Sequence, residues 1–154
     1  MTRDEFLQAL HRAFAQGTFF PDPLNEDAII VDAKDWPAVA VWLRDNPDAD
    51  SKYLEFATAT DYPPQRLRLT YSALSVQHGH RLSVNIDLDR QNPRIKSSAS
   101  VWEGAEWNER EIFDLYGINF EDHPDMRRIL MPDEWEGYPL RKDFTHPNLV
   151  HRPD

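Results

Sequence analysis

The stretch Leu67–Leu88, LRLTYSALSVQHGHRLSVNIDL, predicts the centre of the fold. Apolar side chains take every second position over 67–73 and again over 82–88, which is the period of a β-strand with one buried face. Gly79 lies between the two runs, so we expect a tight hairpin there. The alternation slips at Leu74, which predicts a bulge or an end to regular pairing nearby.

The other face of this predicted sheet is polar. In the second run the alternate positions carry Arg81, Ser83, Asn85, Asp87 and Asp89. A strand with one apolar and one polar side is typical of an antiparallel sheet that is covered on one face only. We therefore expect this second face to meet water or to be half covered.

Further elements flank the hairpin on both sides. Period and capping signals predict helices over 3–15, 36–45 and 106–116, and strands over 28–31 and 53–60. The order is helix, strand, helix, three strands, helix and a C-terminal segment. It favours an α+β fold with a mostly antiparallel sheet and helices packed on one face, followed by a long extended docking tail.

Composition narrows the functional classes. The 154 residues carry a formal net charge of −10, which argues against a nucleic-acid-binding protein. There is no cysteine, so the chain forms no disulfide, zinc–thiolate site or cysteine-ligated iron–sulfur cluster. No apolar run approaches the roughly 20 residues of a membrane-spanning helix, and Met1–Leu10 lacks the pattern of a signal peptide. We expect a cytoplasmic protein that reaches a membrane only through another subunit.

A second stretch, Trp107–Asp143, has the sequence WNEREIFDLYGINFEDHPDMRRILMPDEWEGYPLRKD. Its helix has apolar side chains on more than one stripe, which predicts cover on two sides, and Gly117 is placed to end it. The prolines that follow exclude a helix, yet the segment is too apolar to stay in water. We predict a domain over 1–117 and, over 118–154, an extended segment that wraps a partner protein.

Charged residues of this stretch are interpreted as anchors. Arg110 and Asp114 have the i, i+4 spacing of a helical ion pair, and His123 is interpreted as a structural histidine that holds a turn. The residues predicted to form the partner interface are Glu109, Arg110, Glu111, Asp114, His123, Arg127, Arg128, Trp135, Tyr138, Arg141, Lys142 and Asp143. Among them, the four basic residues of the tail are expected to pair with partner carboxylates, with the two aromatic residues as buried anchors.

The order and spacing of residues in this stretch resemble those of a known protein family. Glu109-Arg110-Glu111, Asp114-Leu115-Tyr116, His123, Arg127 and Ile129-Leu130 stand in the order and spacing of the thirty-kilodalton subunit, the C component, of respiratory complex I, the proton-pumping NADH:quinone oxidoreductase. The similarity covers roughly Trp102–Phe144. Four positions depart from the usual pattern of that family: Asp122, Met126, Glu134 and Thr145.

The resemblance implies a non-catalytic structural subunit of the hydrophilic arm. Such a subunit clamps the large quinone-site subunit, the D component of the complex, next to its neighbour, the B component. The resemblance implies no cofactor in this subunit, with NADH, FMN, iron–sulfur clusters and quinone on partner subunits. It also implies a position on the inner face of a bacterial plasma membrane.

Two other interpretations stay open at this point. Glu109, Glu111, Asp114 and His123 are residue types that a metal-dependent hydrolase would use, although no HExxH-type pairing is present. The equivalent scaffold subunit of a membrane-bound hydrogenase is the other alternative. Apart from these, His78 and His80 flank a glycine and are interpreted as a surface pair.

Overall fold

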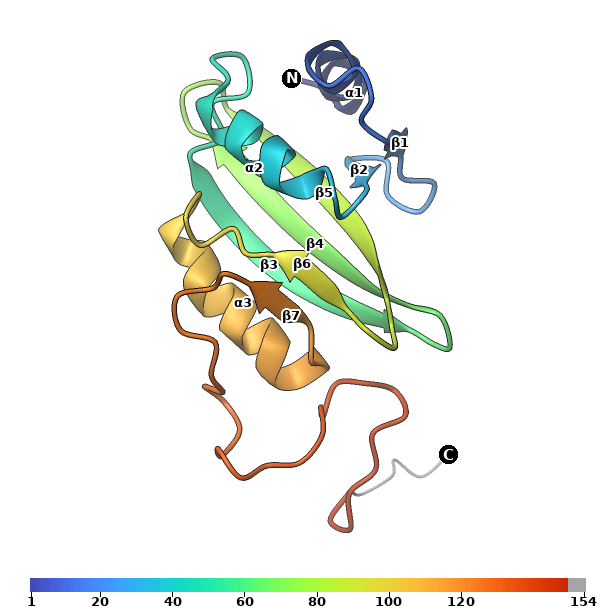
Figure 1. Cartoon of the computed structure of the whole chain (residues 1–154). Helices are drawn as coiled ribbons and strands as arrows, with labels where there is room; N and C mark the ends of the chain where they lie inside the picture. The colour runs from blue at the N-terminus through green and yellow to red at the C-terminus, as the bar shows by residue number, and fades with distance from the viewer. Residues whose placement is uncertain (150–154) are drawn as a thin grey trace.

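A five-stranded sheet forms the centre of the computed structural model, which describes residues 1–149 (Figure 1). The elements in chain order are α1 (Arg3–Ala13), β1 (Phe19–Pro21), β2 (Ala28–Val31), α2 (Trp36–Asp45), β3 (Tyr53–Tyr62), β4 (Arg66–Ser75), β5 (His80–Asp89), β6 (Arg94–Lys96), α3 (Glu103–Tyr116) and β7 (Asn119–Glu121). The strand order is β1-β2-β5-β4-β3, and only the β2–β5 pair is parallel. The predicted α+β fold with a mostly antiparallel sheet is confirmed.

The predicted hairpin is the pair β4 and β5. Its register runs without interruption from Arg66 opposite Asp89 to Ser75 opposite His80. The expected irregularity lies instead in the neighbouring strand β3, where the register shifts between Leu54 and Phe56. The bulge therefore faces the position where the alternation slips, but the extra residue belongs to the partner strand.

The apolar core lies between one face of the sheet and the helices. Trp36 of α2 stacks on Tyr71 of β4 with ring centroids 4.5 Å apart, and its indole N–H donates to the Ser98 hydroxyl over 2.9 Å. Phe6 of α1 stacks against Trp42 on the side of α2. Figure 1 shows α2 and α3 over the same face of the sheet, as predicted.

Several polar side chains on the second face of the sheet are buried and hydrogen-bonded to one another, so they are shielded from water. Arg68 is 5% exposed and donates to Asp22 and to Asp87, and Asn85 is 4% exposed and also donates to Asp22. Ser83 on the same face is buried too. The polar alternation predicted the face correctly, but it could not predict that the loop after β1 would supply Asp22 to cover it.

Two short strands extend the core past the predicted domain boundary at residue 117. β6 and β7 pair in parallel, with Ile95 opposite Phe120. Ile118 and Phe120 are buried with the rest of the core. Three-residue strands carry no measurable period, which is why neither they nor β1 were predicted. The packed unit therefore continues to β7, and the C-terminal segment leaves it after Glu121.

Helix α3 begins at Glu103, ends at Tyr116 and is followed by Gly117 in the left-handed conformation (φ 73°). It packs along β3, where the side chain of Asn108 accepts a hydrogen bond from the N–H of Ala57. The predicted cover on two sides is incomplete, because Trp107 is 62% exposed. Within residues 1–149 no helix has the length and apolar character needed to cross a membrane.

Candidate partner-binding site

The chain after β7 forms turns without helix or strand in its described part and runs past the C-terminal end of α3 (Figure 1). Residues 150–154, the end of the predicted tail, lie outside the described residues. We call residues 128–143 the strap. Two buried carboxylates of the domain, on α3 and on β3, hold the two ends of this strap.

Asp114 holds the first end of the strap. Its side chain is fully buried, and one carboxylate oxygen accepts the consecutive backbone N–H groups of Ile129, Leu130 and Met131 at 3.1, 2.7 and 2.9 Å. The other oxygen accepts the Arg128 guanidinium at 2.6 Å. Burial by itself raises the pKa of Asp114, but these four donors outweigh it and hold the pKa below its ordinary value.

Asp61, at the end of β3, holds the second end. Its buried carboxylate accepts two guanidinium bonds from Arg90, at 2.7 and 3.0 Å, and the backbone N–H of Lys142 at 2.8 Å. Arg90 also donates to Asp143 over 2.7 Å. The bonds from Arg90 are the main reason why the pKa of Asp61 is lowered, against the effect of its burial.

The middle of the strap is closed over the end of α3 by Tyr138. A Cβ atom at Gly117 would lie only 2.4 Å from the Tyr138 ring, so this close approach requires glycine. Arg128 and Arg141 lie against the same ring, 5.5 and 5.2 Å from its centroid. Arg141 also donates to the carbonyl oxygen of Tyr116 over 2.6 Å, which satisfies an acceptor at the helix C-terminus.

A second buried group braces α3 against the sheet. The carboxylate of Glu109 is fully buried and accepts the hydroxyls of Tyr71 and Ser97 at 2.8 and 2.5 Å and the N–H of Ser98 at 2.7 Å. Burial raises the pKa of Glu109 in spite of these donors. The residue thus joins α3 to β4 and to the loop after β6.

His123 has the structural role that the sequence predicts. Its buried ring donates from Nε2 to the carbonyl of Glu106 over 3.0 Å and accepts the N–H of Asp125 at Nδ1 over 3.0 Å. These two partners require a neutral ring with its proton on Nε2. The turn after β7 is therefore fixed to α3.

One predicted contact is wrong: Arg110 and Asp114 do not pair. Asp114 is occupied by the strap, while the Arg110 guanidinium donates to the carbonyl of Arg127 over 3.3 Å and lies 3.8 Å from Asp125. Both residues instead make tertiary contacts with residues 125–131, which follow α3 by about ten residues or more in the sequence.

The predicted interface residues fall into three groups. Buried within the chain are Glu109, Arg110 and Asp114. Partly buried as whole residues are Arg128, Trp135, Tyr138, Arg141 and also His123, whose ring is buried, while Glu111, Arg127, Lys142 and Asp143 are exposed. The buried residues therefore support the surface from inside and cannot touch a partner directly. Arg128 and Arg141 also have partners in their own chain, where carboxylates of another protein were expected.

The apolar part of the surface was not singled out from the sequence. Leu130 and Leu140 of the strap are 58% and 49% exposed, and Trp107 of α3 is exposed as well. In the described residues, Nε1 of Trp135 is the one buried side-chain nitrogen or oxygen without a hydrogen-bond partner. The high apolar content of the C-terminal segment is visible in the sequence. It does not indicate which of the apolar side chains are buried against the domain and which remain exposed.

The residues of the hydrolase hypothesis do not assemble a catalytic site. Asp114 is occupied by backbone donors, and Glu111 is exposed. Nε2 of His123 lies 4.0 Å from Oε2 of Glu109, with both side chains buried. Residues 1–149 contain no group of three or more metal-ligating side chains. His78 and His80 stack on each other and bind the carbonyls of Pro47 and Ala49.

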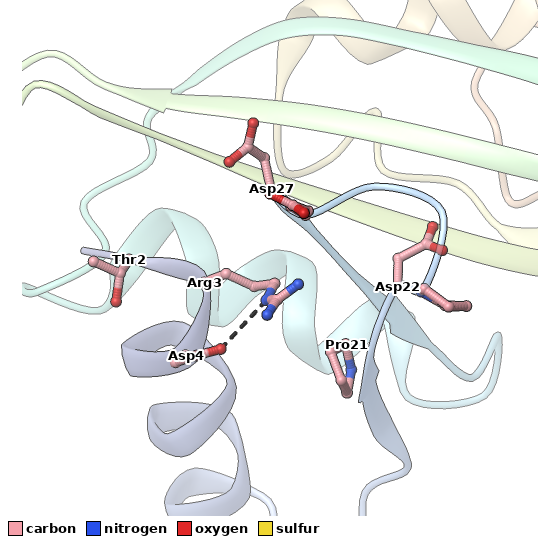
Figure 2. A pocket seen from close by; sticks show the side chains of 8 residues that line it. Thr2, Arg3, Asp4, Pro21, Asp22 and Asp27 are labelled. Atoms are coloured by element: carbon pink, nitrogen blue, oxygen red, sulfur yellow. Dashed lines mark hydrogen bonds and ion pairs between the residues drawn. The ribbon is translucent and has the colours of Figure 1, made fainter.

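A shallow cavity of about 690 Å³ lies between the start of α1 and the loop after β1. Figure 2 shows Arg3 and Asp4 on the helix, facing the loop that carries Asp22 and Asp27. Arg3 pairs with Asp4, and Asp22 is engaged with Arg68 on the sheet. None of the strap residues lines this cavity.

The chain is an α+β domain whose C-terminal strap is bound to the domain at both ends and bears exposed apolar side chains. These features are typical of a protein that works inside a larger assembly. The chain belongs to the family of the 30 kDa subunit of respiratory-chain NADH dehydrogenase, whose model matches residues 29–149. Its curated relatives are described as subunits of NADH-quinone oxidoreductase.

Two curated relatives are similar to this chain over most of its length. The C component of NADH-quinone oxidoreductase from Chloroherpeton thalassium is 41% identical over 132 residues, which are 84% of this chain and 55% of that one. The same component from Moorella thermoacetica is 38% identical over 142 residues, which are 92% and 94% of the two chains. This chain thus spans about half of the first relative and nearly all of the second.

Two solved structures share the fold. A trypsin-resistant fragment (1-134) of Nqo5 superposes with a TM-score of 0.61 at 23% identity, over 80% of this chain and 99% of that one. A chain from the membrane-bound sulfane sulfur reductase, an archaeal respiratory membrane complex, superposes with a TM-score of 0.67 at 21% identity, over 98% and 94%.

Proposed function

We propose that this chain is a non-catalytic scaffold in the hydrophilic arm of a proton-translocating NADH:quinone oxidoreductase. Its strap docks on the large quinone-site subunit, next to the B component, and keeps these neighbours in register. The complex then holds the chain at the inner face of a bacterial plasma membrane. The contribution to turnover is indirect, through the geometry of the quinone cavity.

The observation that carries the proposal is the exposure of Leu130 and Leu140 on a segment that is otherwise anchored. The backbone N–H of Leu130 is bound to Asp114 while its side chain is 58% exposed. Leu140 is likewise bound through its N–H to the carbonyl of Leu115 and is 49% exposed. Apolar side chains on a fixed backbone lose little entropy on binding, which makes them effective anchors for a partner.

Electron carriers are assigned to partner subunits. A chain without cysteine offers no thiolate to an iron–sulfur cluster, and it has no glycine-rich nucleotide loop. We therefore place NADH, FMN, the clusters and quinone on neighbouring subunits.

The alternatives have less support. The hydrolase would need Glu109, Asp114 and His123 to converge on substrate, whereas each is buried against donors or acceptors of its own chain. A scaffold role in another membrane complex would use the same fold, but identities near 40% point to the NADH-quinone oxidoreductase relatives.

The test is assembly of the full-length chain with both strap anchors changed. The Leu130→Gln/Leu140→Gln variant replaces two exposed leucines, so the domain keeps its fold. Loss of two leucine contacts that docking would bury weakens association by at least about tenfold. The measurement is the amount of the large quinone-site subunit that co-purifies with a tagged chain in cells that lack the untagged one.

The matched control is Val41→Gln/Val76→Gln, which changes two exposed valines on α2 and on the β4–β5 turn. This variant should recover as much of the complex as the wild type. If the leucine variant also recovers the wild-type amount, the strap is not the docking element. If the wild-type chain does not recover the large quinone-site subunit, the proposed function itself fails.

A further inference from the structure

The strap has more contacts with its own domain than an extended docking tail requires. Three successive backbone N–H groups, at residues 129–131, converge on one oxygen of Asp114. Successive amides that point to one anion form a concave backbone turn, and the anion here is part of the protein. This turn therefore has a local reason to fold that involves no partner.

The second contact point is equally independent of a partner. The N–H of Lys142 and the side chain of Asp143 are bound to Asp61 and Arg90, which lie on β3 and just after β5. Asp61 is 2% exposed and Arg90 is 6% exposed, so this ion pair is shielded from water. Charge-assisted bonds in such a site are stronger than those on an open surface.

Between these points, the strap is bonded to itself and to the end of α3. Arg128 donates to the carbonyl of Gly137 over 3.0 Å, and the N–H of Leu140 donates to Leu115 over 3.1 Å. The Tyr138 ring lies over Gly117, so close that it leaves no room for a Cβ atom at that position. The loop 132–137 thus projects from a base that is fixed on both sides.

We infer that the strap is folded onto its own domain before the chain meets its partner, with Asp114 and Asp61 as the two positioning residues. The inference deepens the proposed function, on which it rests only for the identity of the partner. Fixing the backbone of the strap costs conformational entropy, and this cost arises when the chain folds and not when it docks. The docking surface is then preformed.

Hydrogen–deuterium exchange of the isolated full-length chain tests this directly. In the wild type, the amides of Ile129, Leu130, Met131 and Lys142 should exchange at least about tenfold more slowly than in an unfolded chain. In Asp114→Asn, the first three should lose about 10- to 100-fold of protection, the factor expected from the loss of bonds to a charged group.

Two further variants serve as a control and as an alternative to Asp114→Asn. Asp133→Asn makes the same chemical change at an exposed strap residue and should leave the protection unchanged. Arg128→Gln removes the ion pair from the strap side, so it reports on the strap even if Asp114→Asn does not fold. Protection of the β4 and β5 amides in each variant shows that the domain itself is intact.

The outcome separates this inference from the proposed function. If the strap amides of the isolated wild type exchange at unfolded rates, the strap orders only on docking and the inference is overturned. Assembly with the large quinone-site subunit, measured as above, would still stand. Slow exchange that Arg128→Gln and Asp114→Asn leave unchanged would also overturn the assigned role of Asp114.

Discussion

Asp114 illustrates how a single residue can be found in the sequence while its partner is missed. The i, i+4 rule offers Arg110, and such a pair is worth only about 0.2–0.5 kcal/mol on a helix surface. In the structure Asp114 is fully buried and has four donors from residues 128–131. A buried carboxylate needs full hydrogen bonding, so the strap and not the helix neighbour determines its environment.

The lowered pKa of Asp114 predicts a dependence of stability on pH. For an acid whose pKa is lower in the folded state, the stabilisation is complete above the unfolded pKa and is lost as the pH falls through the folded pKa. Asp114→Asn should cost about 3 kcal/mol in free energy of unfolding near neutral pH. That cost should shrink as the pH falls from about 6 to about 3, below the usual aspartate pKa of about 3.9.

Urea unfolding of both proteins at several pH values measures this difference. Glu109 contributes with the opposite sign, because its folded pKa is raised and its ionisation disfavours the folded state as the pH rises. Comparing the two proteins at each pH removes this shared contribution. A cost that is constant over the whole range would mean that Asp114 does not act through its charge.

At the scale of elements, the end of α3 could be predicted and its cover could not. Gly117 follows the last apolar positions of the helix, and a left-handed glycine is a frequent helix end. The ring that covers it belongs to Tyr138, in a segment where no period relates sequence to structure. A local rule therefore found the glycine, and only the fold reveals why an alanine at this position is unfavourable.

Gly117→Ala should destabilise the chain by about 1–3 kcal/mol, because it adds a Cβ at positive φ against the Tyr138 ring. Gly104→Ala is the matched control, since nothing lies within 4 Å of its added Cβ and it sits within α3. It should be neutral or stabilising by up to about 1 kcal/mol. Thermal unfolding of the two variants checks both values, and equal melting temperatures would exclude the close contact at Tyr138.

For the molecule as a whole, the sheet and its apolar face followed from the sequence because apolar and polar residues alternate along β4 and β5, and this alternation marks the side chains that face the core. It does not mark burial itself, because several polar positions of the two strands are buried as well. The three-residue strands β1, β6 and β7 were not predicted, since so few residues show no period. The path of the strap was also out of reach. It depends on contacts such as that of Asp61 with Lys142, between residues 81 positions apart, which no local pattern records.

In the function we propose, the strap meets the large quinone-site subunit with Leu130 and Leu140. The most direct measurement places a photo-crosslinking amino acid at position 130, 140 or 76 of the full-length chain and identifies the captured protein in the assembled complex. We expect crosslinks to the large quinone-site subunit from positions 130 and 140 and none from position 76, which lies in the turn after β4, at the end of the sheet opposite Asp61. Capture of that subunit from position 76, with none from the strap, would contradict it.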